Sequence, residues 1–146
     1  ILEKFDIIIA SVHNRFRLDE EQMTARVLRA MKDKHFKVWG HPLGRLLLRR
    51  DPIKCDVEKI LDAVADSRAA VEINGDPYRM DFEPRWAKAA KERGIKIMIS
   101  TDAHAIRDYD NLRFGVHLAR RAGLRKSDIL NAQPVEKFKA AVRPAG

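Results

Sequence analysis

Residues 95–104, IKIMISTDAH, are the stretch that decides the fold of this chain. Residues 95–99 are nearly all apolar instead of alternating with polar residues, which is typical of a strand that is covered on both faces. Asp102 and His104 follow at the predicted carboxyl end of this strand. Ligands bind at that end of the strands in α/β folds, and Asp and His together suit zinc, manganese or iron. We therefore expect an α/β fold in which this strand end presents two candidate metal ligands.

The pattern of a strand followed by a helix recurs along the chain. Asp19 is positioned to cap a helix, with Gln22 where the partner in a capping box belongs. Strands that alternate with helices imply parallel pairing through right-handed crossovers, so four such units predict half of an eight-fold barrel or a small open sheet. The predicted strands are 5–12, 36–40, 69–73 and 95–99, and the predicted helices begin at Asp19, at Asp56, at Pro84 and near Asn111, with one or two short helices in 127–142 broken at Pro134 and a turn or short helix at 43–50.

Composition narrows the class of protein. The chain has 146 residues, 45% of them hydrophobic and 34% charged, which predicts one globular domain over residues 1–146. The formal net charge of +8 favours polyanionic partners such as nucleic acid or phosphate esters, although a basic solvated surface explains it equally well. The single Cys55 excludes an internal disulfide framework, and no apolar run approaches the length of a membrane span. We therefore expect a cytoplasmic location and no membrane partner.

Each of the four predicted strands ends in side chains that carry chemistry: His13, His41, Glu72 with Asn74, and Asp102 with His104. The carboxyl ends of parallel strands lie at one edge of a sheet, so these groups are expected to converge on one cleft. A single metal-type side chain at a strand end has little weight, but the recurrence at every strand end is hard to explain by packing. The pattern therefore favours a metal site.

Each of these residues also has a structural alternative. His13 alone suits a hydrogen-bonded core histidine, and His41, which precedes a proline, suits an ordinary turn. Asp102 is a suitable helix cap. Glu72 suits a buried ion pair, and residues 74–75 suit a turn.

Arginine supplies the candidate contacts for an anionic substrate. Arg45 lies near His41 in the sequence, and a guanidinium fork matches the geometry of a phosphate, so we expect Arg45 to contact one. The alternative, an exposed structural arginine, has equal weight. Other cationic residues are candidates for holding a DNA backbone or for a solvated rim: Arg49, Arg50, Arg79, Arg120, Arg121, Arg125 and Lys126.

Three short motifs, SVH at 11–13, GHP at 40–42 and TDAH at 101–104, resemble in this order the later motifs of the PHP (polymerase and histidinol phosphatase) superfamily. The segments GHPLGRLLLRRDP, VEINGDPYRMD, IKIMISTDAH and RFGVHLARRAGLRKSDILNAQP are similar to the PHP domain at the C-terminus of bacterial family X DNA polymerases. The resemblance covers nearly the whole chain. It implies a distorted, TIM-like (β/α)7 barrel, up to three bound metals, and 3′-5′ exonuclease or related DNA 3′-end processing that depends on manganese or zinc, with iron as a further option.

Carried over residue by residue, the resemblance implies four metal ligands, the last two of them also catalytic: His13, His41, Asp102 and His104. The His and Glu residues that the family takes from its first strands have no counterpart here, so the chain resembles the C-terminal half of a PHP barrel. Four ligands cannot complete a three-metal cluster, so we expect this chain alone to bind one or two metals weakly and to have little activity. The implied partners are DNA 3′ ends or another phosphoester and polymerase domains of the same full-length chain. Half a barrel leaves two open sheet edges, so a homodimer that fills this gap is a further option.

Three other functions stay open at this point. A stand-alone PHP phosphatase would act on a small phosphate ester, but the basic balance and the GRLLLRR segment argue against it. An amidohydrolase-like barrel also uses His and Asp at strand ends, but the SVH and GHP motifs fit it poorly. A non-catalytic PHP remnant would bind DNA or stabilise a polymerase, and retention of all four candidate ligands argues against it.

Overall fold

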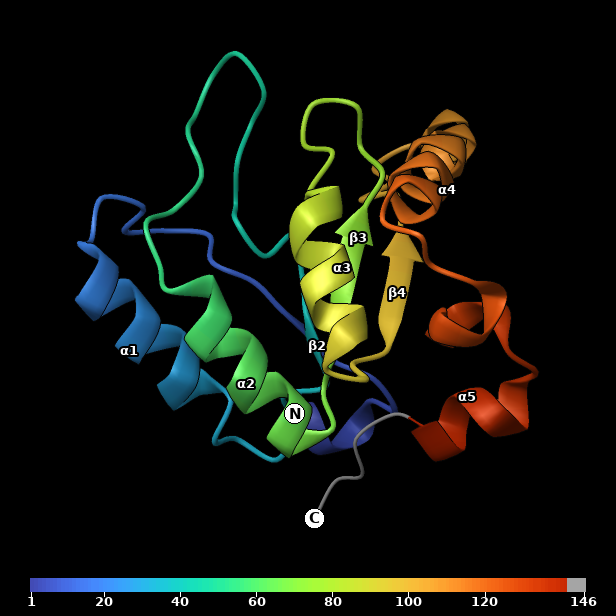
Figure 1. Ribbon diagram of the computed structural model, residues 1–146, viewed down its shortest axis with the longest axis horizontal. Helices are drawn as coiled ribbons and strands as arrows, with labels where there is room; N and C mark the ends of the chain where they lie inside the picture. The colour runs from blue at the N-terminus through green and yellow to red at the C-terminus, as the bar shows by residue number, and fades with distance from the viewer. Residues whose placement is uncertain (142–146) are drawn as a thin grey trace.

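A computed structural model describes residues 1–141 of the chain (Figure 1). Its centre is a parallel sheet with the strand order β1-β2-β3-β4, in which helices connect consecutive strands. The elements are β1 (Ile9–Ala10), α1 (Glu20–Ala30), β2 (Val38–Trp39), α2 (Val57–Ser67), β3 (Ala70–Asn74), α3 (Pro84–Glu92), β4 (Ile97–Ser100), α4 (Leu112–Arg121) and α5 (Val135–Ala141), with short 3-10 helices at Leu2–Lys4, Ile106–Asn111, Lys126–Asp128 and Leu130–Ala132. The predicted α/β class with four parallel strands is confirmed. The last residue of the predicted 127–142 helical segment lies outside the described residues.

The helices begin where the sequence predicts. The Asp19 carboxylate accepts a hydrogen bond from the Gln22 amide at 2.8 Å, and the Asp56 carboxylate accepts one from the Lys59 amide at 3.0 Å. Each bond satisfies an N–H that the first turn of a helix leaves free. Pro84 occupies the first turn of α3, where its missing N–H costs nothing.

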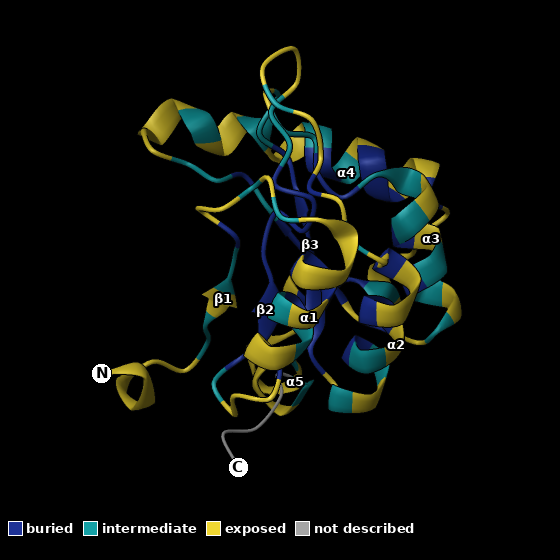
Figure 2. Ribbon diagram, turned by 90° about the vertical axis from the view of Figure 1, so that its left-hand side faces the viewer, coloured by how far each residue is buried: buried dark blue, intermediate teal, exposed yellow. Residues whose placement is uncertain are grey.

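The two faces of the sheet are covered differently. Figure 2 shows α2, α3 and α4 together on one side of the sheet, and the main core lies between these helices, α1 and the strands. Successive strand residues point to opposite faces. Val71 and Ile73 therefore join the main core, whereas Ala70 packs with Met98 and Leu130 in a smaller cluster on the other face. Glu72 alternates with Val71 and Ile73 and so points to the face away from α2, α3 and α4, the face on which α5 contributes Phe138 and Ala141.

The first strand is shorter and more exposed than its sequence predicts. Only residues 9–10 pair with β2, and the side chains of Phe5 and Ile9 are 59% and 46% exposed. The prediction of a buried strand over 5–12 is therefore wrong. β1 is the edge strand and only its residues 9–10 pair with β2, so residues 5–7 lie outside the paired part of the sheet, where Phe5 is open to solvent.

The opposite edge of the sheet is closed by a side chain. Ile129 forms a parallel bridge with Ile97, and the Asn131 amide then bonds both backbone groups of Ile99. Its Oδ1 accepts from the Ile99 N–H at 3.1 Å and its Nδ2 donates to the Ile99 carbonyl oxygen at 2.7 Å. Asn131 thus satisfies backbone groups that an edge strand otherwise leaves unpaired.

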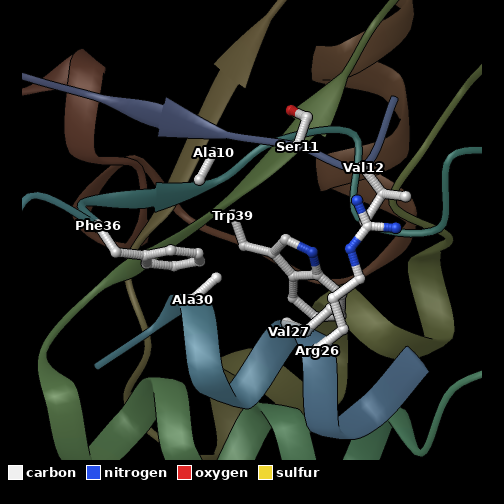
Figure 3. Close-up of a pocket in the computed structure, with 8 residues that line it drawn as sticks. All are labelled: Ala10, Ser11, Val12, Arg26, Val27, Ala30, Phe36 and Trp39. Atoms are coloured by element: carbon white, nitrogen blue, oxygen red, sulfur yellow. The ribbon is translucent and has the colours of Figure 1, made fainter. Parts of the chain in front are cut away.

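A cavity of about 160 Å³ separates β1 from α1 (Figure 3). The facing side chains there include two alanines, Ala10 and Ala30, which leave space beside Phe36 and Trp39. Arg26 at its rim donates to the backbone oxygen and to Oδ1 of Asn14, at 2.9 and 2.7 Å. Helix α1 therefore holds the loop that leaves β1 at its carboxyl end.

Candidate metal-binding active site

The structure brings two of the predicted ligands, His13 and His41, into direct contact. Their Nε2 atoms lie 3.2 Å apart, and the ring planes are tilted by 59°. His13 follows β1 and His41 follows β2. Because these strands are parallel, both rings lie at the carboxyl end of the sheet. His41 is buried and His13 is exposed, so solvent reaches the pair from the His13 side.

The absence of a side chain at Gly40 allows this approach. A Cβ atom at Gly40 would lie 2.3 Å from Cγ2 of Ile9 and 2.5 Å from Oγ of Ser11, which are distances that non-bonded atoms do not adopt. The side chains of Ile9 and Ser11 therefore lie directly against Gly40, and Ser11 is two residues before His13. His41 itself has a φ of +24°, so its backbone is held in a conformation that L residues rarely adopt.

The buried carboxylate of Glu72 holds the backbone of His41. Glu72 Oε2 accepts a hydrogen bond from the His41 amide at 2.5 Å and a longer one from Asn74 Nδ2 at 3.3 Å, and Oε1 accepts one from the Ser100 hydroxyl. Because Glu72 is only 4% exposed, these donors take the place of water around its charge. Glu72 thus connects the carboxyl ends of β2, β3 and β4.

A second set of contacts fixes the loop that follows His41. The buried Asp81 carboxylate accepts the Leu43 amide at 3.0 Å. The Arg45 guanidinium donates to Glu83 Oε1 and to the backbone oxygens of Arg79 and Met80. The guanidinium predicted to contact a phosphate therefore spends its donors on the 79–83 loop, and a phosphate contact by Arg45 stays a prediction.

The third candidate ligand, Asp102, forms an ion pair with Arg79. Its Oδ2 accepts from Arg79 Nε at 2.7 Å, and both side chains are about four-fifths buried. Asp102 has a φ of +53°, a left-handed conformation that Asp tolerates better than most residues. The predicted alternative of a helix cap does not apply to its carboxylate, because Asp108 Oδ2 accepts the amides of His104 and Ala105 at the start of the following 3-10 helix.

His104 lies at the rim of the site. Its side chain is exposed, and its Nδ1 lies 2.6 Å from the Asp102 carbonyl oxygen, so Nδ1 carries the hydrogen of that bond. Nε2 is thereby left as the nitrogen with a free lone pair, which is the form in which histidine binds a metal. The described residues contain no group of three or more His, Cys, Asp or Glu side chains positioned together for a metal ion.

The electrostatics of the site favour a neutral His41. Burial, followed by the positive charge of Arg79, lowers the pKa of His41, and the charge of Asp102 acts in the opposite direction. Asp102 and Arg79 thus lie within electrostatic range of the histidine pair. A ring that stays unprotonated near neutral pH has a lone pair available for a metal.

Sequence reasoning missed the roles of Arg79 and Glu72. The sequence leaves Arg79 as a candidate for a DNA-backbone contact or for the solvated rim, yet it pairs with Asp102, and its Nη1 is buried without a hydrogen-bond partner among the described residues. The turn after Asn74 could have indicated the position of Arg79, because it carries the following residues back across the carboxyl end of the sheet, where the candidate ligands lie. Glu72 could have been placed by the alternation of strand residues between the two faces.

Comparison with known proteins gives relatives along nearly the whole chain. The chain is 32% identical over 143 residues, 98% of its length, to a DNA polymerase/3′-5′ exonuclease PolX of Bacillus subtilis. It is 32% identical over 140 residues to a probable phosphatase of a Thermoanaerobacter species and 30% identical over 148 residues to one of Caldanaerobacter subterraneus. These relatives are consistent with the resemblance to the PHP domain of family X DNA polymerases. No family model matches it.

The chain spans only part of these relatives: 25% of the length of PolX and 55–56% of the two phosphatases. The names of all three describe hydrolytic enzymes that act on phosphate esters. Neither the described residues nor the relatives support the expected homodimer. No helix among residues 1–141 combines the length and the apolar character needed to cross a bilayer.

Proposed function

We propose that the chain is part of a metal-dependent phosphoesterase, and that its site acts as a 3′-5′ exonuclease or in related DNA 3′-end processing. The observation that carries the proposal is the contact between His13 and His41 at the sheet edge where Asp102 also lies. The relationship to a polymerase with exonuclease activity and to phosphatases supports the phosphoester as substrate class. A small phosphate ester is the alternative substrate, which the two phosphatase relatives favour.

The histidine pair fits a divalent metal. Two nitrogens that share a tetrahedral zinc ion at about 2.0–2.1 Å each lie about 3.3 Å apart. The observed separation of 3.2 Å between the Nε2 atoms matches this value. We propose His13, His41, Asp102 and His104 as the residues that hold the metal, with manganese or zinc as the ion and iron as a third option. Asp102 would exchange its bond to Arg79 for this role.

A bound divalent metal lowers the pKa of water and stabilises charge on phosphate oxygens, which is the chemistry that ester hydrolysis at neutral pH needs. The residues of the chain supply the rest. Glu72 fixes the His41 backbone, the Asp81 and Arg45 contacts fix the loop behind it, and His41 stays neutral because it is buried. Arg79 places a guanidinium beside Asp102, where a phosphate group would bring negative charge.

We also propose the finer architecture. The four parallel strands, in sequential order with the connecting helices α1, α2 and α3 packed on the main core, are arranged as in part of a distorted (β/α)7 barrel. On this proposal residues 1–146 are the C-terminal part of one PHP domain, and the full-length chain carries polymerase domains, as the similarity to PolX suggests. A cytoplasmic location belongs to the same proposal.

The test measures metal binding before activity. Isothermal titration of Mn²⁺ or Zn²⁺ into the chain should show binding that His41→Gln weakens at least tenfold, because one of two contacting nitrogens is lost. The matched control is His117→Gln, since His117 is an exposed histidine on α4. Hydrolysis of a 3′-labelled oligonucleotide is then followed with the chain in large excess over DNA, which makes slow turnover visible.

Two results would overturn the proposal. One is metal binding that His41→Gln leaves unchanged, which would remove the histidine pair from the site. The other is hydrolysis by the parent chain that EDTA does not suppress and that His41→Gln and His117→Gln affect equally.

A further inference from the structure

A large groove lies between the two loops that follow the histidines. Its volume is about 920 Å³, and its walls are the residues 15–19 and 46–54. The first wall begins two residues after His13, and the second belongs to the loop that starts at His41 and projects past the strand ends in Figure 1. This volume lies at the upper end of the range for pockets that hold drug-sized ligands, and far exceeds the space that one phosphate group occupies.

The groove is positively charged. Its walls carry five cationic and two acidic side chains: Arg15, Arg17, Arg49, Arg50, Lys54, Asp19 and Asp51. Among the described residues, the cationic side chains other than Arg50 lack both an ion-pair partner and a hydrogen-bond acceptor in the protein. Asp19 is engaged in capping α1. The exposed cations therefore remain free to contact an anionic chain.

Two of these arginines lie against aromatic rings. Phe16 lines the groove and lies under Arg50, whose guanidinium carbon is 3.8 Å from the ring centroid. Tyr78 is 61% exposed and lies under Arg49, at 5.5 Å. Phe16 is only partly exposed and Arg50 covers one face of its ring, whereas Tyr78 does not line the groove but lies exposed at its margin, beside Arg49. An exposed ring beside an arginine is a surface on which an unpaired base stacks, and a small phosphate ester has no base for it to bind.

The groove is electrostatically continuous with the proposed active site. Burial and the charge of Arg79 lower the pKa of Arg50, which lines the groove, and the charge of Arg79 also acts on His41. Arg79 in turn bonds Asp102. Since the walls of the groove are the loops that leave His13 and His41, a polyanion in the groove would lie next to the histidine pair.

From this arrangement we propose that the groove between residues 15–19 and 46–54 binds single-stranded nucleic acid, with phosphates on the arginines and a base against the exposed ring of Tyr78 at its margin. The proposal deepens the proposed function and rests on it for the position of the reacting end. It selects a polynucleotide over a small phosphate ester as the substrate class. The binding itself needs neither metal nor hydrolysis.

The experiment measures binding without catalysis. Fluorescence anisotropy in EDTA records the affinity of the chain for a labelled 12-nucleotide single strand over a series of salt concentrations. Arg17→Gln with Arg49→Gln should weaken binding about tenfold and reduce the slope of log affinity against log salt by about 1.4, since each phosphate contact on a single strand contributes about 0.7. Tyr78→Leu should weaken binding about fivefold through lost stacking.

The matched control is Arg29→Gln with Lys32→Gln, which removes the same charge from exposed positions at the C-terminal end of α1. It should leave the affinity within twofold. Equal losses in both double variants would overturn the proposal, as would displacement of the oligonucleotide by poly-glutamate at the same charge concentration. If the groove binds DNA but metal-dependent hydrolysis is absent, the proposed function fails alone; if a small ester is hydrolysed but the single strand does not bind, the groove proposal fails alone.

Discussion

Replacement of Glu72 should lower the stability of the fold considerably, although Glu72 is not a proposed metal ligand. Its carboxylate accepts hydrogen bonds from the His41 amide and the Ser100 hydroxyl, and a weaker one from Asn74. A buried hydrogen bond to a charged group contributes about 1.5–3 kcal/mol. Two such bonds give about 3–6 kcal/mol for Glu72→Ala, a large share of the 5–15 kcal/mol by which a domain is typically stable.

Glu72→Gln is the more informative variant because it keeps the shape of the side chain. Its single amide oxygen can accept from only one of the two strong donors, and its NH2 group then faces the other. We expect a loss of about 1.5–3 kcal/mol in the free energy of unfolding. The variant should also weaken Mn²⁺ binding, since the unusual backbone conformation of His41 loses its anchor.

Urea unfolding followed by circular dichroism measures this loss. The control is Glu92→Gln, because Glu92 is exposed on α3 and forms a long ion pair of 3.9 Å with Lys88. This variant should change the free energy of unfolding by less than about 0.5 kcal/mol. A Glu72→Gln protein that unfolds at the same urea concentration as the parent, with unchanged Mn²⁺ affinity, would refute the assigned role of this carboxylate.

Three further predictions concern the scaffold. Asn131→Ala leaves the two backbone groups of Ile99 unpaired and should cost about 1–3 kcal/mol in urea unfolding, whereas no change would remove the edge-closing role. Gly75→Ala places a Cβ 2.8 Å from the Asn111 carbonyl oxygen, so the melting temperature should fall by several degrees; an unchanged value would contradict this packing. Burial raises the pKa of Asp81 to about 7, so ionising it destabilises the fold above pH 7, and this destabilisation disappears as the pH falls from 7 toward 4. The melting temperature of the parent should therefore rise relative to that of Asp81→Asn between pH 8 and pH 5.5, and parallel curves would contradict the shift.

Much of the fold could be predicted from the sequence because its signals are local. A cap such as Asp19 needs only the amide three residues later, and a strand such as β3 is marked by its own run of apolar residues. The extent of β1 could not be predicted in this way. Whether residues 5–8 are buried depends on a neighbouring strand, and the sequence of the segment itself is equally apolar with or without one.

The candidate site could be predicted in part for a similar reason. Parallel pairing of β1 and β2 brings His13 to His41, and the order of the motifs already implied that pairing. The choice between Arg45 and Arg79 depended on how two loops, separated by more than thirty residues, fold over one another. Since both side chains are arginines near a strand end, no local pattern distinguishes the one that faces Asp102 from the one that holds the loops together.

Gly40 gives the site an unusual form of sensitivity to mutation. Any larger residue there has to push β1 outward, because Ile9 and Ser11 occupy the space of its first side-chain carbon. A displacement of β1 carries His13 away from His41. The spacing of the histidine pair is therefore set by a position that has no side-chain functional group. In a saturation mutagenesis screen for metal uptake, position 40 should tolerate substitution as poorly as the histidines do.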